Sequence, residues 1–103
     1  MILKTATFEV RPDGIDTCLV ATRTFVAEIE ATQPATLVYR SLQDAAEPTR
    51  FLNIMLFPDG DAEEIHRSSD ATRRFTEFIY PLTVAPPRFT GWTQVAAVDR
   101  TTS

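Results

Sequence analysis

The most apolar stretch of the chain reads Arg50-Phe51-Leu52-Asn53-Ile54-Met55-Leu56-Phe57. Because successive side chains of a strand point to opposite faces, this stretch has two faces. One face carries Phe51, Asn53, Met55 and Phe57, and the other carries Leu52, Ile54 and Leu56. Both faces are largely apolar, which is typical of a strand that is covered on both sides. We therefore predict a buried strand over residues 50–57, around which the rest of the fold is arranged.

The sequence on either side of this strand switches between the periods of strands and helices. Residues 2–10 alternate apolar and polar side chains, as a half-buried strand does. Further strands are predicted over residues 36–42 and 88–98, and helices over residues 15–31, 62–67 and 70–80. The order β-α-β-β-α-β predicts an α+β, ferredoxin-like fold: a four-stranded antiparallel sheet with its helices on one face.

Each long helix has one apolar stripe that should face the sheet. In the first helix, the apolar residues of the stripe are Ile15, Cys18, Leu19, Phe25, Val26 and Ile29. Thr22 is the one polar residue that falls on the same stripe. In the last helix, the side chains expected to be buried are Phe75, Phe78, Ile79 and Leu82. The turn Pro58-Asp59-Gly60-Asp61 and the run Ser68-Ser69-Asp70 supply candidate N-caps, so two consecutive helices are expected in this region.

Helices on one face of a sheet leave its other face uncovered. Here that other face includes one apolar side of the strand at residues 50–57. A soluble monomer rarely exposes an apolar patch larger than a few hundred Å². The simplest cover is a second copy of the same chain, so we predict a homodimer that is formed through this sheet face.

Composition and charge narrow the class of protein. The chain has 103 residues, of which 44% are apolar and 23% charged, which fits one domain over residues 1–103 with a polar tail from about residue 99. Its net charge of -4 argues against nucleic acid or an anionic membrane as a partner, because both are bound by cationic surfaces. No targeting segment or membrane span is recognised, and the single cysteine cannot form an internal disulfide, so a cytoplasmic location is expected.

A motif that runs from the second strand into the short helix carries a family resemblance. Leu37 and Tyr39 form a Leu-x-Tyr pair, Phe57 ends the third strand, His66 follows nine residues later, and Ser69 lies three residues beyond it. Over about residues 2–98, this pattern resembles the antibiotic biosynthesis monooxygenase (ABM) family. The resemblance implies a ferredoxin-like fold that dimerises sheet to sheet into a dimeric α+β barrel.

The same resemblance implies a function. Enzymes of this kind oxidise phenolic or polyketide-like aromatic small molecules without a cofactor, because the substrate anion donates an electron to O2 directly; neither a metal nor a flavin is expected. His66 or Tyr39 would assist deprotonation of the substrate, and Asn53 would hold a developing oxyanion. The substrate pocket would lie between the sheet and the short helix, with walls that include Phe51, Met55 and Phe57.

Each candidate also has a structural explanation. His66 can fix the helix against the sheet, Tyr39 can be a core aromatic residue, and Asn53 can satisfy its amide internally. Glu63 and His66 have the E-x-x-H spacing of a di-iron ligand pair, but such sites need a second histidine, and this chain has one. A metal site is therefore not expected.

Two departures from the family pattern keep a second function open. Met55 stands where the family often carries Glu, and Phe57 stands where it usually carries Trp. Because a fold does not determine a chemistry, the alternative is a non-catalytic, dimeric small-molecule-binding or accessory protein of the same fold.

Overall fold

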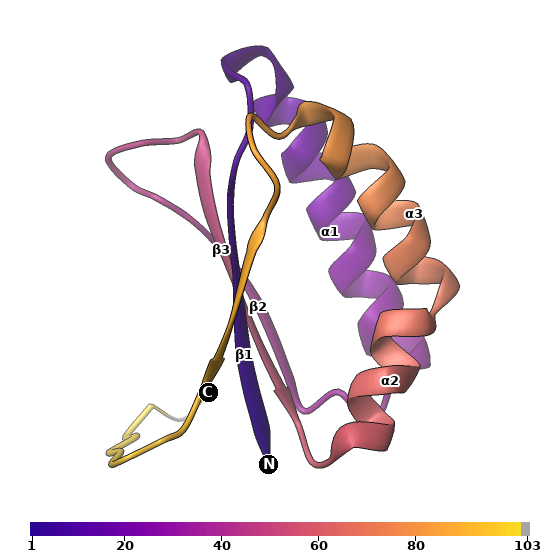
Figure 1. The fold of residues 1–103 in the computed structure, drawn as a ribbon, viewed down its shortest axis with the longest axis vertical. Coiled ribbons are helices and arrows are strands. Elements are labelled where there is room, and N and C mark those ends of the chain that lie inside the picture. The colour runs from indigo at the N-terminus through magenta and orange to yellow at the C-terminus, as the bar shows by residue number, and fades with distance from the viewer. Residues whose placement is uncertain (102–103) are drawn as a thin grey trace.

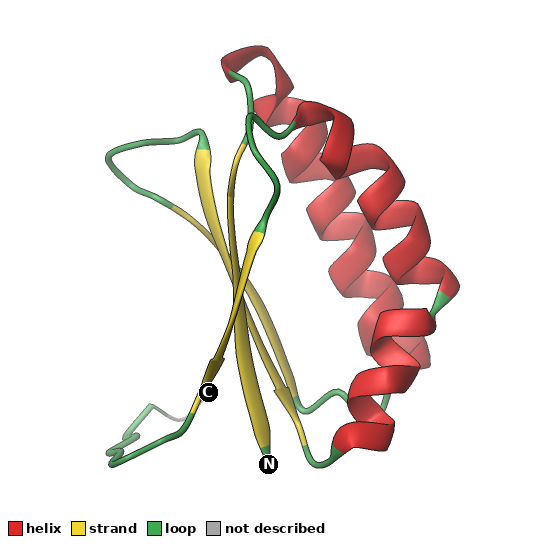
Figure 2. Ribbon diagram, viewed as in Figure 1, coloured by secondary structure: helices red, strands yellow, loops and turns green. Residues whose placement is uncertain are grey.

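In the computed structural model, which describes residues 1–101, a four-stranded antiparallel sheet carries all of the helices on one face (Figures 1 and 2). The strands are β1 (Ile2–Glu9), β2 (Val38–Gln43), β3 (Arg50–Phe57) and β4 (Arg88–Trp92). The helices are α1 (Ile15–Thr32), α2 (Gly60–Ser68) and α3 (Asp70–Ile79). The strand order is β2-β3-β1-β4, which confirms the predicted ferredoxin-like α+β fold.

The two faces of the sheet differ in burial, and β3 shows the difference along its length. Its side chains alternate between buried and half-buried from Phe51 to Phe57. The buried set, which includes Asn53 and Met55, faces the helices, whereas Leu52, Ile54 and Leu56 point to the face that no helix covers. Within one chain, β3 is therefore covered on one side only, as the predicted sheet-to-sheet dimer requires.

The helices begin where the sequence supplies caps. The Asp59 carboxylate accepts a hydrogen bond from the backbone N–H of Ala62 at 2.9 Å and so caps α2. Ser69, the single residue between α2 and α3, accepts one from the N–H of Thr72 at 3.2 Å and caps α3. These side chains satisfy backbone donors that a helix start leaves unpaired. Both predicted N-cap regions are thus confirmed.

The core lies between the sheet and the helices, and stacked aromatic pairs join neighbouring elements within each of these two layers. Phe8 of β1 stacks on Phe51 of β3 with ring centroids 5.4 Å apart, and Phe25 of α1 stacks on Phe75 of α3 at 4.4 Å. The predicted stripe of α1 is confirmed, including Thr22, which is 8% exposed.

The predicted burial of Phe78 is wrong, because its side chain is 60% exposed. In α3, Ala71, Phe75 and Ile79 recur every four residues and take the side that faces the sheet. Phe78 lies about a quarter-turn from Ile79 on the helix circumference, so it points away from the sheet. Leu82, predicted for the same stripe, lies in the 3-10 turn after α3 and is half-buried.

The last strand is shorter than predicted. Residues 88–98 were expected to pair, but β4 ends at Trp92, whose partner is Leu3 near the start of β1. Because β1 begins at Ile2, only this one residue of the strand lies beyond Leu3, so a β4 that reached residue 98 would have almost nothing to pair with. Residues 93–101 continue without regular structure, and residues 102–103 of the predicted tail lie outside the described residues.

The second strand begins later than predicted. It was expected over residues 36–42, but β2 runs from Val38 to Gln43. Thr36 still belongs to the turn after α1, where its N–H donates to the carbonyl of Gln33.

Within residues 1–101, no helix is long and apolar enough to cross a membrane.

Candidate functional site

A cavity of about 670 Å³ lies between the sheet and the helices. It is large enough for a drug-sized molecule. Its walls include His66 from α2, Tyr39 from β2 and Asn53 from β3, so the three predicted site residues meet in one cavity. Apolar side chains make up most of the remaining lining, including Ala6, Phe8, Phe25, Met55, Phe57 and Phe75.

His66 is buried among aromatic rings. The ring centroids of Phe57, Tyr39 and Phe25 lie 5.3, 5.5 and 5.7 Å from that of the imidazole. Because this burial disfavours the charged form, the pKa of His66 falls to about 4, although the carboxylate of Glu63 acts in the opposite direction. At neutral pH His66 is therefore an uncharged imidazole with one nitrogen available as an acceptor.

The position of the imidazole is fixed by a hydrogen-bonded group that the sequence did not reveal. Nδ1 of His66 lies 2.8 Å from Oε1 of Gln33, a buried residue at the end of α1. The amide nitrogen of Gln33 donates to Oγ of Ser69 at 3.0 Å. In the sequence, Gln33 stands before Pro34 and signals only the end of a helix, so no local pattern indicated this contact.

Tyr39 and Asn53 form the polar part of the sheet wall. Burial raises the pKa of Tyr39 well above its ordinary value, and the amide of Asn53 partly opposes this effect. The phenol is consequently neutral at physiological pH and can donate a hydrogen bond. Oδ1 of Asn53 is buried without a hydrogen-bond partner among the described residues. An unpaired buried acceptor is costly, and a bound donor would remove that cost.

A pair of opposite charges lies at the edge of the cavity. Lys4 of β1 and Glu63 of α2 form an ion pair, and both residues line the cavity. The pairing explains why a lysine interrupts the apolar face of β1. No group of three or more histidine, cysteine or carboxylate side chains within residues 1–101 is arranged to hold a metal ion.

The three apolar residues predicted to line the pocket have different positions. Met55 and Phe57 line the cavity, and Phe57 also packs against the ring of His66. Phe51 does not line it: at the other end of β3, its ring is stacked on Phe8 in the core. The buried face of β3 thus lines the cavity at its Phe57 end and belongs to the core at its Phe51 end.

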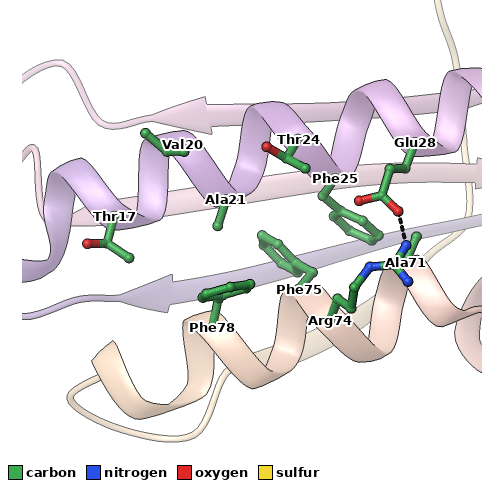
Figure 3. A pocket seen from close by; sticks show the side chains of 10 residues that line it. All are labelled: Thr17, Val20, Ala21, Thr24, Phe25, Glu28, Ala71, Arg74, Phe75 and Phe78. Carbon is green, nitrogen blue, oxygen red and sulfur yellow. Dashed lines mark hydrogen bonds and ion pairs between the residues drawn. The ribbon is translucent and has the colours of Figure 1, made fainter.

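A second, smaller cavity of about 280 Å³ is a groove between α1 and α3 on the outer side of the helices (Figure 3). Its walls carry the exposed side chains of Val20 and Phe78, and an ion pair joins Glu28 to Arg74 across it. His66, Tyr39 and Asn53 lie elsewhere, so the inner cavity is the candidate active site.

The sequence profile of the family described as antibiotic biosynthesis monooxygenase matches residues 1–77 of the chain. These residues include β1, β2, β3 and the helix with His66. The chain belongs to the antibiotic biosynthesis monooxygenase family. This membership confirms the resemblance that the motif from Leu37 to Ser69 indicated. A search of curated proteins gives no match to the sequence.

Solved structures of ABM proteins have the same fold. A crystal structure of an antibiotic biosynthesis monooxygenase is 24% identical, covers 93% of this chain and 100% of its own, and has a TM-score of 0.85. A protein provisionally assigned to the same activity from Nitrosomonas europaea is 18% identical over 93% of this chain and 100% of its own, with a TM-score of 0.84. A third such protein, from Caulobacter crescentus, is 21% identical, covers 92% of this chain and 90% of its own, and also has a TM-score of 0.84. At these identities the likeness is one of fold.

Proposed function

We propose that this ABM protein is a cofactor-independent monooxygenase that oxidises a phenolic or polyketide-like aromatic small molecule. The observation that carries the proposal is the inner cavity, where an uncharged imidazole, a neutral phenol and an amide share one largely apolar enclosure. Apolar walls suit an aromatic ring system, and a few polar groups suffice to orient it. We place the protein in the cytoplasm, in keeping with its single free cysteine.

His66 is proposed as the base. It takes a proton from an acidic C–H or O–H of the bound aromatic, and the resulting anion donates one electron to O2. Recombination of the two radicals forms a C–O bond, and loss of water leaves a carbonyl, so a CH2 group and O2 become C=O and H2O. The imidazolium is stabilised by the substrate anion, whose charge adds to that of the Glu63 carboxylate and raises the pKa of His66 above its low value in the ligand-free protein.

Tyr39 and Asn53 are proposed to hold the oxygen of the substrate. The raised pKa of Tyr39 suits a hydrogen-bond donor rather than a base. The amide of Asn53 can turn its N–H toward an oxyanion and present Oδ1, which lacks a partner here, to a hydroxyl of the ligand.

The test is oxygen uptake with a panel of hydroxylated aromatics. Wild-type protein should consume O2 with one or more members of the panel, and His66→Gln should lower turnover by roughly 10²–10⁴-fold, the usual contribution of a positioned base. Ile65→Ala is the matched control, because Ile65 is the neighbour of His66 on α2 but is 56% exposed. Equal turnover in wild type and His66→Gln would remove the catalytic role.

The second candidate is a non-catalytic, dimeric small-molecule-binding or accessory protein. Met55 and Phe57 favour it, because they replace the Glu and Trp that many family members carry in this cavity wall. On this alternative, members of the same panel bind and raise the melting temperature but no O2 is consumed.

We further propose that two chains pair through the uncovered sheet face. It presents the half-buried side of β3, Leu42, which is 47% exposed, and Trp92, which is 56% exposed. The indole N–H of Trp92 bonds Oγ1 of Thr5, so the ring is held against this face. Sedimentation at micromolar concentration should show a dimer, and Ile54→Asp should shift it to monomer. A wild-type chain that is monomeric at that concentration contradicts the proposal.

A further inference from the structure

We propose that Gln33 is a positioning residue that holds His66 in the tautomer with the proton on Nδ1, so that Nε2 presents its lone pair to the cavity. A neutral imidazole has one N–H and one acceptor nitrogen, and only the acceptor can take a proton from a ligand. The effect of Gln33 on turnover rests on the proposed function. The tautomer itself is a property of the protein without substrate.

The first step is the contact between the two side chains. Oε1 of Gln33 lies 2.8 Å from Nδ1 of His66. An amide oxygen only accepts hydrogen bonds, so Nδ1 must carry the proton. Both side chains are buried, with exposed fractions of 5% for Gln33 and 7% for His66, so water does not compete for this bond.

The second step is the orientation of the amide, because a rotated amide would place its nitrogen against Nδ1. The hydroxyl of Ser69 decides this. Its single proton is shared between two acceptors, the backbone carbonyl of His66 at 2.9 Å and the hydroxyl of Thr72 at 3.0 Å, and it accepts from the N–H of Thr72 at 3.2 Å. Its remaining lone pair needs a donor, which Nε2 of Gln33 supplies at 3.0 Å. On the other side, the hydroxyl of Thr36 lies 3.2 Å from Oε1 and donates to it.

The backbone keeps Gln33 in place as well. Its N–H donates to the carbonyl of Ile29 at 2.8 Å as α1 ends, and its carbonyl accepts from the N–H of Thr36 at 3.0 Å. The end of α1 and the junction between α2 and α3 are thus joined by one amide. A side chain whose backbone and both polar atoms are paired has little freedom to rotate away.

The third step concerns the other nitrogen of the imidazole. Within residues 1–101, Nε2 of His66 has no hydrogen-bond partner. This nitrogen is not fully buried, because Oδ1 of Asn53 is the only fully buried side-chain nitrogen or oxygen without a partner among these residues. Since His66 lines the cavity, this nitrogen is open to it. A hydrogen bond to one ring nitrogen therefore determines what the other offers to a ligand, the usual arrangement for a histidine that transfers protons.

The chain is well suited to a direct test, because His66 is its only histidine. In protein labelled with ¹⁵N-histidine, long-range ¹H–¹⁵N spectra at neutral pH report which ring nitrogen is protonated. Wild type should show a protonated Nδ1 and an unprotonated Nε2. A wild-type spectrum with the proton on Nε2 overturns the proposal, even if no variant folds.

Two substitutions separate positioning from general support of the fold. Gln33→Met keeps the length of the side chain but removes the acceptor, so the Nε2–H form, minor in wild type, should become the major one. Gln33→Glu keeps an acceptor next to Nδ1 and should retain the wild-type tautomer. Gln43→Met is the matched control, since Gln43 is exposed and its side chain bonds only the carbonyl of Pro48 among the described residues. An unchanged tautomer in Gln33→Met also overturns the proposal.

The consequence for catalysis is measured separately. With a substrate that wild type oxidises, Gln33→Met should lower kcat more than it changes KM, and Gln33→Glu should restore part of the loss. If wild type consumes no O2 with any substrate, the proposed function fails while the tautomer measurement still decides the role of Gln33.

Discussion

His66 couples the stability of this fold to pH. Its pKa is lowered to about 4 in the folded chain, whereas a histidine in an unfolded chain titrates near 6.5. Between these values the unfolded chain binds one more proton than the folded chain does, so the free energy of unfolding falls as the pH falls. The loss begins as the pH drops through about 6.5 and is complete below about 4.

The two pKa values give the size of this effect. Linkage predicts that His66 removes about 2 kcal/mol of stability between pH 7 and pH 5. Solvent that enters the cavity lowers this value, so we expect a loss of about 1–2 kcal/mol, which is a large part of the stability of a small domain.

Urea titrations at pH 7, 6 and 5 measure the effect in wild type and in His66→Gln, at one protein concentration. The substituted amide does not titrate and still offers an N–H to the acceptor that His66 uses. Carboxylates titrate in both proteins, so the difference between the two pH profiles isolates the only histidine of the chain. Parallel profiles would refute the assignment of His66 as a buried, uncharged imidazole.

Three further predictions concern packing, capping and reactivity. Phe75→Ala should cost about 3–5 kcal/mol in urea unfolding because it empties part of the core, whereas Phe78→Ala, at an exposed position of the same helix, should change stability by less than about 0.5 kcal/mol. Asp59→Ala should cost about 1 kcal/mol by removing the cap of α2, and Asp61→Ala, within the first turn, should cost less; equal losses would mean that charge rather than capping is responsible. Burial raises the pKa of the Cys18 thiol, so a thiol reagent should react with Cys18 only at the rate of unfolding, and rapid labelling of the native protein would contradict its burial.

Sequence patterns predicted those parts of the fold that depend on a single element. The alternation in residues 50–57 identified β3 and its two faces, because strand geometry alone assigns each side chain to a face. The end of β4 depends on how much of β1 remains to pair with, and the exposure of Phe78 depends on where α1 lies. Neither dependence can be read from the local pattern.

The candidate site was predictable to a similar extent. The spacing of Tyr39 and His66 indicated the family, and the fold brings both together with Asn53 in one cavity. Gln33 was missed because its role arises from a contact between the end of one helix and the last turn of another. Phe51 shares a strand face with Asn53 but lies outside the cavity, where its ring packs on Phe8, and this contact between two strands cannot be read from the pattern of one.

The central position of β1 has a consequence for synthesis on the ribosome. β1 is the first strand to emerge, but its partners β3 and β4 lie far along the chain. A nascent chain released up to the end of α3 can already assemble β2, β3 and β1 beneath the helices, since β4 adds only to the remaining edge. Pro87 and Phe89, which line the cavity, arrive with that last strand. Vectorial folding would therefore assemble His66, Tyr39 and Asn53 first and enclose them last.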